Sequence, residues 1–259
     1  MQPLPPLRYL LFFFLTALLM GACQSESETA QDLEDQLPVQ RPPLDQDYDI
    51  AKHKWGYIDT SGELFISARF DDSRNFIEDF AVVRMEGRWG FINRQGETLV
   101  PPKYLAAWDF SEGLARVQTM DEQMGFIDTS GQLVIPATFE SARDFSDGLA
   151  RITSDNRHGY IDHGGELVLP LQYEAASNFQ DGQAIVQVDG KYGIINKSGK
   201  FIIKPLYDRI DFFKEGLARA QKNDQYGFIN KKGEVIIPFQ YELARSFVNG
   251  RAPAKRDGK

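Results

Sequence analysis

Short runs of alternating apolar and polar residues, separated by turn-forming residues, fill the chain after residue 50. Residues 113 to 138 give one example: GLARVQT alternates, MDEQ reads as a turn, MGFID is a second run, TSG turns the chain and QLVIP is a third run. Alternation with a period of two is typical of strands with one buried face. We therefore predict three antiparallel strands here, the third stopped by Pro136, because proline has no N–H to donate to a ladder.

The same pattern occurs six times. The stretch KWGYIDTSGELFI, residues 54 to 66, returns as RWGFINRQGETLV, QMGFIDTSGQLVI, RHGYIDHGGELVL, KYGIINKSGKFII and QYGFINKKGEVII. The first glycine of each copy, at steps of 34, 35, 34, 34 and 34 residues, is Gly56, Gly90, Gly125, Gly159, Gly193 and Gly227. The second is Gly62, Gly96, Gly131, Gly165, Gly199 and Gly233. A fixed period of this length indicates tandem units that pack on their neighbours.

Aromatic residues keep the same period. One series is Phe70, Tyr104, Phe139, Tyr173, Tyr207 and Tyr241, and a second is Phe76, Phe110, Phe145, Phe179, Phe213 and Phe247. The residue before the first glycine varies: it is Trp55, Trp89, Met124, His158, Tyr192 and Tyr226. A position that tolerates such different side chains suits packing better than recognition of one ligand. We therefore interpret the motif, with its tryptophans and glycines, as a structural unit. The alternative is six equivalent binding niches.

Each copy has the same turn between its second and third predicted strands. The turn begins with Asp or Asn and reaches the second glycine three residues later; the first residues are Asp59, Asn93, Asp128, Asp162, Asn196 and Asn230. Such a side chain can bond the backbone two residues on, and glycine adopts positive φ without strain. The spacing predicts a hairpin with a turn and a bulge. The residues that connect one unit to the next show no helical period, so we expect irregular turns there.

The predicted fold is all-β: six tandem units of about three antiparallel strands, in a curved repeat array over residues 51–259. A closed propeller-like ring would pair residues 251–256 with residues 52–58. An open superhelical array would leave both segments unpaired. The last three residues, DGK, repeat a turn that elsewhere leads into the motif. That remnant favours the open array, with the ring as the alternative.

These sequence elements resemble the WG-repeat family of bacterial proteins, also called KWG repeats. The shared elements are W-G-Y/F-I-D/N-x-x-G, then V/I-P-x-x-Y/F, then F-x-E/D-G-L-A, and they cover residues 52 to 259. Later copies depart from the pattern, since only Trp55 and Trp89 keep the tryptophan. The resemblance implies a β-rich repeat array and supplies no catalytic residue.

Residues 1 to 22 have the pattern of a secretory signal peptide. Arg8 precedes YLLFFFLTALLM, an uncharged run of about twelve residues that is too short to span a bilayer core of ~30 Å. The only cysteine, Cys23, ends LMGAC, which resembles the bacterial lipobox. The resemblance implies that Cys23 is acylated and that the exported protein is lipid-anchored to the cell envelope. In lipoproteins with this motif, an Asp after the cysteine retains the protein in the inner membrane. The residue here is Gln24, so in a Gram-negative cell we expect the protein in the outer membrane. A plain signal peptide with an incidental cysteine is the alternative.

Residues 23–50 then form the lipidated cysteine plus an acidic disordered tether. Residues 24 to 50 hold eight acids, three prolines and one base, Arg41, and such a segment buries too little apolar surface to fold. Residues 51–259 carry 27 Lys and Arg against 29 Asp and Glu. This nearly neutral part has no basic stripe, so we expect no nucleic-acid partner.

The sequence carries no motif for catalysis, cofactor binding or metal binding. Its histidines are His53, His158 and His163, and it has no HExxH, GxSxG or GxxxxGK[ST] sequence. We therefore predict no catalytic, cofactor or metal residue and no enzyme activity. Acids recur before the Gly-Leu-Ala step, at Glu78, Glu112, Asp147, Asp181 and Glu215. They could bind cations or basic peptides at one edge, or simply favour turns and face water.

The function that these features favour is a membrane-tethered scaffold that binds another envelope protein. A peptidoglycan or polysaccharide binding module is the alternative, with exposed Trp108, Tyr192 or Tyr226 as stacking platforms. A hydrolase with an unrecognised site is the third possibility. The exposure of the aromatic side chains distinguishes the protein scaffold from the glycan-binding module, because a glycan-binding protein presents its aromatic side chains along a groove.

Overall fold

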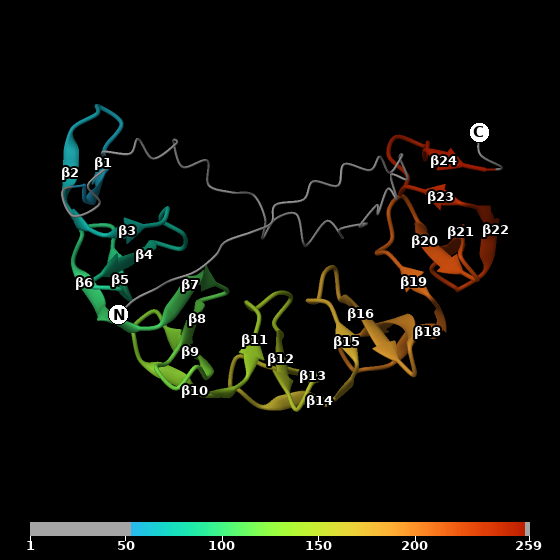
Figure 1. The fold of residues 1–259 in the computed structure, drawn as a ribbon, viewed down its shortest axis with the longest axis horizontal. Coiled ribbons are helices and arrows are strands. Elements are labelled where there is room, and N and C mark those ends of the chain that lie inside the picture. Colours follow the sequence, from blue (N-terminus) through green and yellow to red (C-terminus); the bar gives the residue numbers. More distant parts are fainter. Residues whose placement is uncertain (1–52, 257–259) are drawn as a thin grey trace, which may run out of the picture. The chain divides into compact units, whose positions relative to one another are not determined.

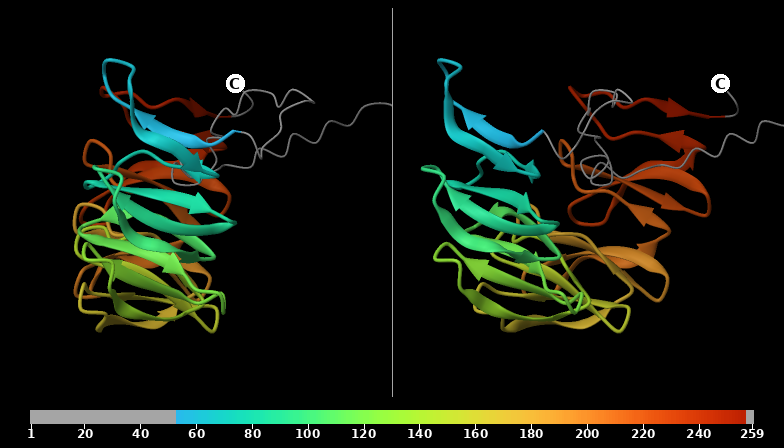
Figure 2. Two further views of the ribbon diagram at one scale, coloured as in Figure 1. Left: turned by 90° about the vertical axis from the view of Figure 1, so that its left-hand side faces the viewer. Right: turned by 60° about the vertical axis from the view of Figure 1, so that its left-hand side comes forward.

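The computed structural model describes residues 53–256, all within the unit Asp49–Lys259. Over this range the chain forms strands and turns and no helix. Accordingly, residues 53–256 hold no helix that is long and apolar enough to cross a membrane. The predicted signal peptide, Cys23 and the acidic tether lie outside the described residues. Figures 1 and 2 show the strands grouped into small sheets that follow one another in chain order.

Five four-stranded antiparallel sheets take four consecutive strands each, β3–β6, β7–β10, β11–β14, β15–β18 and β19–β22, between the pairs β1–β2 and β23–β24. The first strands are β3 (Asp72–Ser73), β7 (Ala106–Ser111), β11 (Ser141–Ala142), β15 (Ala175–Ala176), β19 (Arg209–Ile210) and β23 (Leu243–Ala244). The second strands are β4 (Phe80–Met85), β8 (Leu114–Gln118), β12 (Ala150–Ser154), β16 (Gln183–Val188), β20 (Leu217–Lys222) and β24 (Ala254–Lys255).

The motif forms the last two strands of each sheet. The third strands are β1 (Trp55–Ile58), β5 (Arg88–Asn93), β9 (Met124–Asp128), β13 (Arg157–Ile161), β17 (Lys191–Asn196) and β21 (Gln225–Asn230). The fourth strands are β2 (Leu64–Phe70), β6 (Thr98–Tyr104), β10 (Leu133–Phe139), β14 (Leu167–Tyr173), β18 (Phe201–Tyr207) and β22 (Val235–Tyr241).

The all-β array of six repeat units is confirmed. Within residues 53–256 no sheet closes the array, because β1 pairs with β2 alone and β24 with β23 alone. The connector that the sequence left irregular adds a further strand to each sheet, which is only two residues long in most units. It is too short to show an alternating pattern in the sequence, and its pairing with the second strand reveals it.

The prediction that Pro136 stops its strand is wrong. β10 continues through the proline to Phe139, and among the described residues it pairs only with β9. Proline is tolerated here because β10 is an edge strand, where a missing N–H breaks no ladder. The register also shifts, since Ile135 faces Phe126 while Phe139 faces Met124. The fourth strand therefore bulges around Gly125.

The first glycine of the motif lets this bulge approach the third strand. A Cβ on Gly125 would lie 2.7 Å from the carbonyl oxygen of Ile135 and 2.8 Å from the nitrogen of Ala137. The other five glycines of the series would meet the equivalent carbonyl at 2.4 to 2.7 Å. Backbone atoms cannot move away as a flexible side chain can, so any larger residue would displace the strand.

Buried side chains fill the spaces between successive sheets. At the first complete interface they come from both sheets: Val82, Phe91, Val100, Tyr104, Ala107, Phe110, Ala115, Val117 and Ile127. Phe110 and Tyr104 represent the two aromatic series, and both are buried. Each aromatic series therefore serves the contact between neighbouring units, as expected when every unit offers its neighbour the same apolar surface.

Candidate functional site

Exposed apolar side chains recur at the start of the fourth strands. Two consecutive residues are exposed on β2, β10, β14 and β22, and one on β18, each between 37% and 63%. We call them the apolar row: Leu64, Phe65, Leu133, Val134, Leu167, Val168, Phe201, Val235 and Ile236. The fourth strand is also the edge of each sheet, so its outer side has no hydrogen-bonded neighbour within residues 53–256.

The turn before each fourth strand rests on the preceding sheet. A Cβ on Gly131 would come within 2.8 Å of Cγ2 of Val100, and one on Gly165 within 3.2 Å of Cγ2 of Ile135. Fourth strands of successive sheets therefore begin on the same side of the array. Figure 1 shows β6, β10, β14, β18 and β22 at corresponding places in successive sheets. The apolar row thus recurs on β10, β14, β18 and β22 and on β2, while β6 contributes no member, because Thr98 is polar and Leu99 is half-buried.

The Asx-x-x-Gly turns hold the start of the row in place. In one of them, Oδ1 of Asp128 accepts hydrogen bonds from the backbone N–H of Ser130 at 2.9 Å and of Gln132 at 3.0 Å. All six turns have this geometry, and their glycines have φ between 77° and 88°. The Ser130 hydroxyl and these amides lower the pKa of Asp128. The turn is thus organised by one side-chain oxygen.

The recurring acids before the Gly-Leu-Ala step join neighbouring units. The carboxylate of Glu78 accepts hydrogen bonds from the backbone N–H groups of Glu112 and Gly113, both at 2.9 Å. Glu112 binds the amide of Gly148 at 3.0 Å in the same way. Sequence reasoning offered cation binding or solvent exposure and missed this role. The sequence does carry a signal for this role: an acid stands beside a turn glycine in successive units, so an acid of one unit could bind the glycine amide of the next.

Arginines of the second strands make a parallel set of contacts. Arg116, Arg151 and Arg219 each donate to a carbonyl on the short first strand of the next sheet, at Ala142, Ala176 and Ala244. Arg116 is 5% exposed. Its guanidinium stands 3.9 Å from the ring centre of Trp108, and its Nε is 3.1 Å from the carboxylate of Asp144. The polar contacts between units are therefore partly buried.

The aromatic residues suggested as glycan platforms are covered. Trp108 is half-buried beneath Arg116. Tyr226 is 7% exposed, with the guanidinium of Arg219 5.2 Å from its ring centre. Tyr192 is half-buried in the core cluster between sheets. Among the motif tryptophans, Trp89 is half-buried between Arg74 and Arg84, whereas Trp55 at the first strand is 54% exposed.

Asp109 is an acid in an unfavourable environment. The side chain is half-buried on β7, and its Oδ1 has no hydrogen-bond partner among residues 53–256. Burial raises the pKa of this carboxyl, the Arg74 guanidinium opposes the rise, and the nearby Asp144 carboxylate adds to it. The charged form of Asp109 therefore opposes folding at neutral pH.

Two histidines make contacts with neighbouring side chains. Nδ1 of His158 lies 2.8 Å from the Thr153 hydroxyl. His163 stacks on Phe145 with ring centres 4.4 Å apart, and its Nε2 is 3.1 Å from the Glu112 carboxylate. Across residues 53–256, no group of three or more His, Cys, Asp and Glu side chains could hold a metal ion.

Solved structures that match the chain include Hsv2 from Kluyveromyces lactis, at 8% identity and a TM-score of 0.41 over 61% of this chain and 58% of that one. BamB from Moraxella catarrhalis has 13% identity and a TM-score of 0.36, over 69% and 76%. The WD40 beta propeller domain of Doa1 has 13% identity and a TM-score of 0.31, over 68% and 72%. The chain spans less than two thirds of the length of Hsv2. No curated protein matches it.

A family model described as WG containing repeat matches six consecutive stretches of the chain. They are residues 55–89, 89–121, 124–157, 159–192, 192–226 and 226–259. Each matched stretch contains one of the six motif glycines against which a bulged edge strand packs. The chain therefore belongs to the family of WG containing repeat proteins.

Proposed function

We propose that this WG-repeat protein is a membrane-tethered scaffold of the cell envelope that binds another protein through its apolar row. The observation that supports the proposal is the recurrence of exposed apolar pairs at the start of β2, β10, β14 and β22, with a single exposed phenylalanine on β18. Extended exposed apolar surface marks interaction sites, and repeated contacts let one partner engage several units at once. Polar residues precede the row: Glu63, Gln132, Glu166, Lys200 and Glu234. A partner with apolar side chains beside polar ones would fit it.

The envelope part of the proposal rests on the N-terminal sequence. Acyl chains on Cys23 would anchor the protein, since each buried CH₂ contributes ~0.8 kcal/mol, and residues 24–50 would keep the repeats away from the membrane. Replacement Cys23→Ser should release the protein from the membrane pellet, and labelled palmitate should enter only the unchanged protein. A variant that stays in the pellet, with no label in the unchanged protein, would contradict the anchor.

The alternative of a peptidoglycan or polysaccharide module has less support, because Trp108 and Tyr226 are covered by arginine side chains. We propose no enzymatic activity. A sacculus-binding assay tests the alternative directly. Retention of the purified protein on sacculi, undiminished by Leu133→Glu, would favour the glycan function over the protein scaffold.

Site-specific photo-crosslinking tests the scaffold itself. A photoreactive residue in place of Val134 or Val168 should give a discrete adduct with one envelope protein. The same residue in place of Leu206 is the control, because Leu206 is also exposed, at 54%, but lies near the other end of β18, outside the row. The paired change Leu133→Glu and Leu167→Glu should abolish the adduct. Equal crosslinking from Leu206 would contradict the role of the row.

A further inference from the structure

Every complete sheet pairs an alanine of its second strand with an isoleucine of its third. The pairs are Ala81 with Ile92, Ala115 with Ile127, Ala150 with Ile161, Ala184 with Ile195 and Ala218 with Ile229. All ten side chains are at most 1% exposed. In the described part of the chain, the sixth isoleucine, Ile58, and the sixth alanine, Ala252, have no such partner. Ile58 is 68% exposed.

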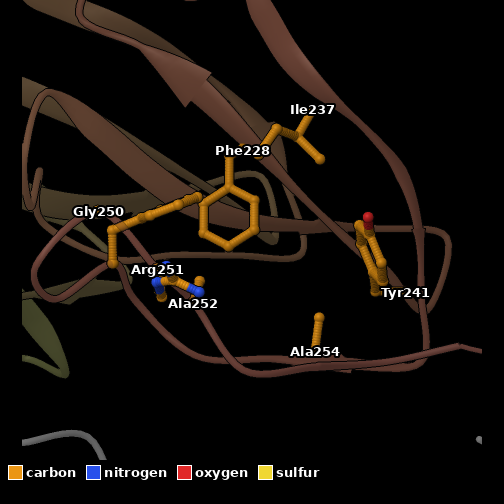
Figure 3. Close-up of a pocket in the computed structure, with 8 residues that line it drawn as sticks. Phe228, Ile237, Tyr241, Gly250, Arg251, Ala252 and Ala254 are labelled. Atoms are coloured by element: carbon orange, nitrogen blue, oxygen red, sulfur yellow. The ribbon is translucent and has the colours of Figure 1, made fainter.

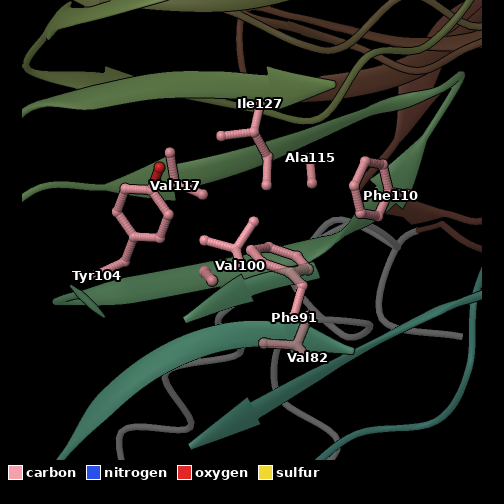
Figure 4. Close-up of a cluster of buried hydrophobic side chains, with 9 residues drawn as sticks. Val82, Phe91, Val100, Tyr104, Phe110, Ala115, Val117 and Ile127 are labelled. Carbon is pink, nitrogen blue, oxygen red and sulfur yellow. The ribbon is translucent and has the colours of Figure 1, made fainter. Parts of the chain in front are cut away.

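The C-terminal strand pair borders a pocket that matches this isoleucine (Figure 3). Its apolar lining is Phe228, Ile237, Tyr241, Phe247, Ala252 and Ala254. The residues in the same places at the first complete interface (Figure 4) are Phe91, Val100, Tyr104, Phe110, Ala115 and Val117. There Ile127 of β9 completes the cluster. The pocket is therefore the position of a third-strand isoleucine, beside a strand pair that has no third strand within residues 53–256.

The backbone of β24 is oriented to receive that third strand. The carbonyl oxygens of Pro253 and Lys255 accept hydrogen bonds from Arg245 and Glu242, both at 2.9 Å, and so face β23. Backbone groups alternate along an antiparallel strand. Those of Ala252 and Ala254 therefore point to the open side. The missing N–H of Pro253 falls on the side that is already paired.

At the other end of the array, β1 has a matching open edge. Trp55, Tyr57 and Ile58 pair with Phe70, Ile66 and Leu64 of β2. The backbone N–H of Asp59 donates to the carbonyl of Glu63, so the backbone groups of Asp59 face the β2 side. The same alternation leaves the backbone groups of Gly56 and Ile58 on the side away from β2. In complete sheets this side of the third strand receives the second strand, as where Val117 pairs with Gly125.

We propose that β24 of one molecule pairs with β1 of a second molecule, head to tail, and so completes a four-stranded sheet between them. In the register of the complete sheets, Ala252 lies opposite Ile58 of the second molecule, Ala254 opposite Gly56 and Lys255 opposite Trp55. Ile58 enters the pocket. Arg251 comes opposite Asp59, a charge match at a place where Leu114 faces Asp128 within the chain.

We assign a second copy of the chain as the occupant because the open edge of β24 lacks a third strand and the open edge of β1 lacks a second strand, so each edge supplies what the other lacks. Within residues 53–256 of one chain β1 pairs with β2 alone, so this chain's own β1 does not fill the site. A contact between two different surfaces of identical molecules leaves one edge of each kind free. Association therefore continues into a filament, or ends where the rotation between copies closes a ring. The inference does not depend on the partner proposed for the apolar row.

Disulfide trapping tests the pairing and its register. Lys255 and Trp55 would form a pair without mutual hydrogen bonds, whose Cα atoms lie about 4.5 Å apart in such ladders, within reach of a disulfide. Full-length Lys255→Cys and Trp55→Cys, each with Cys23→Ser, should form a covalent heterodimer when mixed and oxidised. Lys255→Cys mixed with Phe65→Cys is the control, because Phe65 is 63% exposed but lies on β2. No dimer above this control overturns the proposal. A disulfide formed only within one chain, when both cysteines are in the same molecule, overturns it in favour of ring closure.

A charge at position 58 tests the pocket. Sedimentation should show assembly of the unchanged protein that grows with concentration, and Ile58→Lys should abolish it without altering the melting temperature, since Ile58 is exposed in the single chain. Leu206→Lys is the control, because Leu206 is also exposed, at 54%, but lies on β18, away from both open edges and outside the apolar row. Equal loss of assembly in both variants would overturn the role of the pocket.

Discussion

The carboxylate of Glu78 accepts a hydrogen bond from the backbone N–H of Gly113, which lies 35 residues later in the chain and 2.9 Å away. One carboxylate thus fixes the turn of the next unit. The same contact joins Asp147 to Gly182 and Glu215 to Gly250. Units are therefore connected by polar contacts at their turns as well as by the apolar clusters between sheets.

Replacement of Glu78 by alanine should weaken the contact between the first units. We expect the free energy of unfolding to fall by about 1 kcal/mol, below the usual contribution of bonds to charged groups because the site is exposed. Urea denaturation measures the change. Asn249→Ala is the control, because Asn249 has the same turn conformation, with φ of 52°, in the last unit. An equal loss in both variants would mean that backbone strain, not the contact between units, explains the effect.

Alanine at Gly125 should be strongly destabilising although its φ is unremarkable. The added Cβ would meet backbone atoms of β10 at 2.7 and 2.8 Å, and overpacking of this kind costs about 1–3 kcal/mol. Gly164→Ala is the control, since its Cβ would meet only a carboxylate oxygen of Asp162, at 3.2 Å. Similar melting temperatures for the two variants would refute the role of close approach.

Valine at Gly131 combines two unfavourable effects. Its φ of 83° places a β-branched residue in a strained region, at about 1–3 kcal/mol, and its Cβ would lie 2.8 Å from Cγ2 of Val100 in the preceding unit. Gly216→Val has the strain alone, with φ of 81° and no atom within 4 Å of the new Cβ. Thermal melting should show the larger loss for Gly131→Val. An unchanged melting temperature would count against the turn assignment.

Asp128 should tolerate asparagine but not alanine. Asn93, Asn196 and Asn230 accept the same backbone hydrogen bonds in other units, whereas alanine has no acceptor. The pKa of Asp128 is lowered from 3.8, so its stabilising effect is present above that value and is lost as pH falls through the lower folded-state pKa. Melting curves at neutral and acidic pH measure this. A loss with asparagine equal to that with alanine would argue against the side-chain acceptor.

Asparagine at Asp109 should stabilise the protein at neutral pH. Burial raises the pKa of this carboxyl above 3.8, so folding favours the protonated form. The penalty for the charge is absent below the ordinary pKa and appears as pH rises through the folded-state value. Asn75 and Asn178 occupy the same place in other units. We expect Asp109→Asn to raise the melting temperature at pH 7 and to have no effect in acid.

The control for that prediction is Asp144→Asn, which should act in the opposite direction. Asp144 is paired with the buried Arg116, and removal of one partner leaves a buried charge uncompensated. The melting temperature should fall at pH 7. If Asp109→Asn also destabilises the protein, the carboxylate of Asp109 has a favourable partner, and burial does not dominate its energetics.

Much of the fold could be predicted because each unit repeats its local signals. The Asx-x-x-Gly turns depend on one side-chain oxygen and one positive φ, which are properties of single residues. The third and fourth strands alternate over enough residues to be recognised. By contrast, Pro136 was misjudged, because an edge strand tolerates a proline that a central strand does not, and edge position is decided by pairing between strands.

The sequence by itself determined the period, the turns and the apolar surface that each unit offers its neighbour, since these are written within a few consecutive residues. Only the tertiary structure decided how units are joined. The bond from Glu78 to Gly113 spans a full repeat, and the cover of Arg116 over Trp108 turns a candidate binding residue into a packed one. The motif around Ile58 is the same as that around the buried Ile127, so the exposure of Ile58 follows only if the array is open, which the sequence favoured without excluding the ring. What differs is whether a second strand pairs with the motif, and that depends on the arrangement of the whole array.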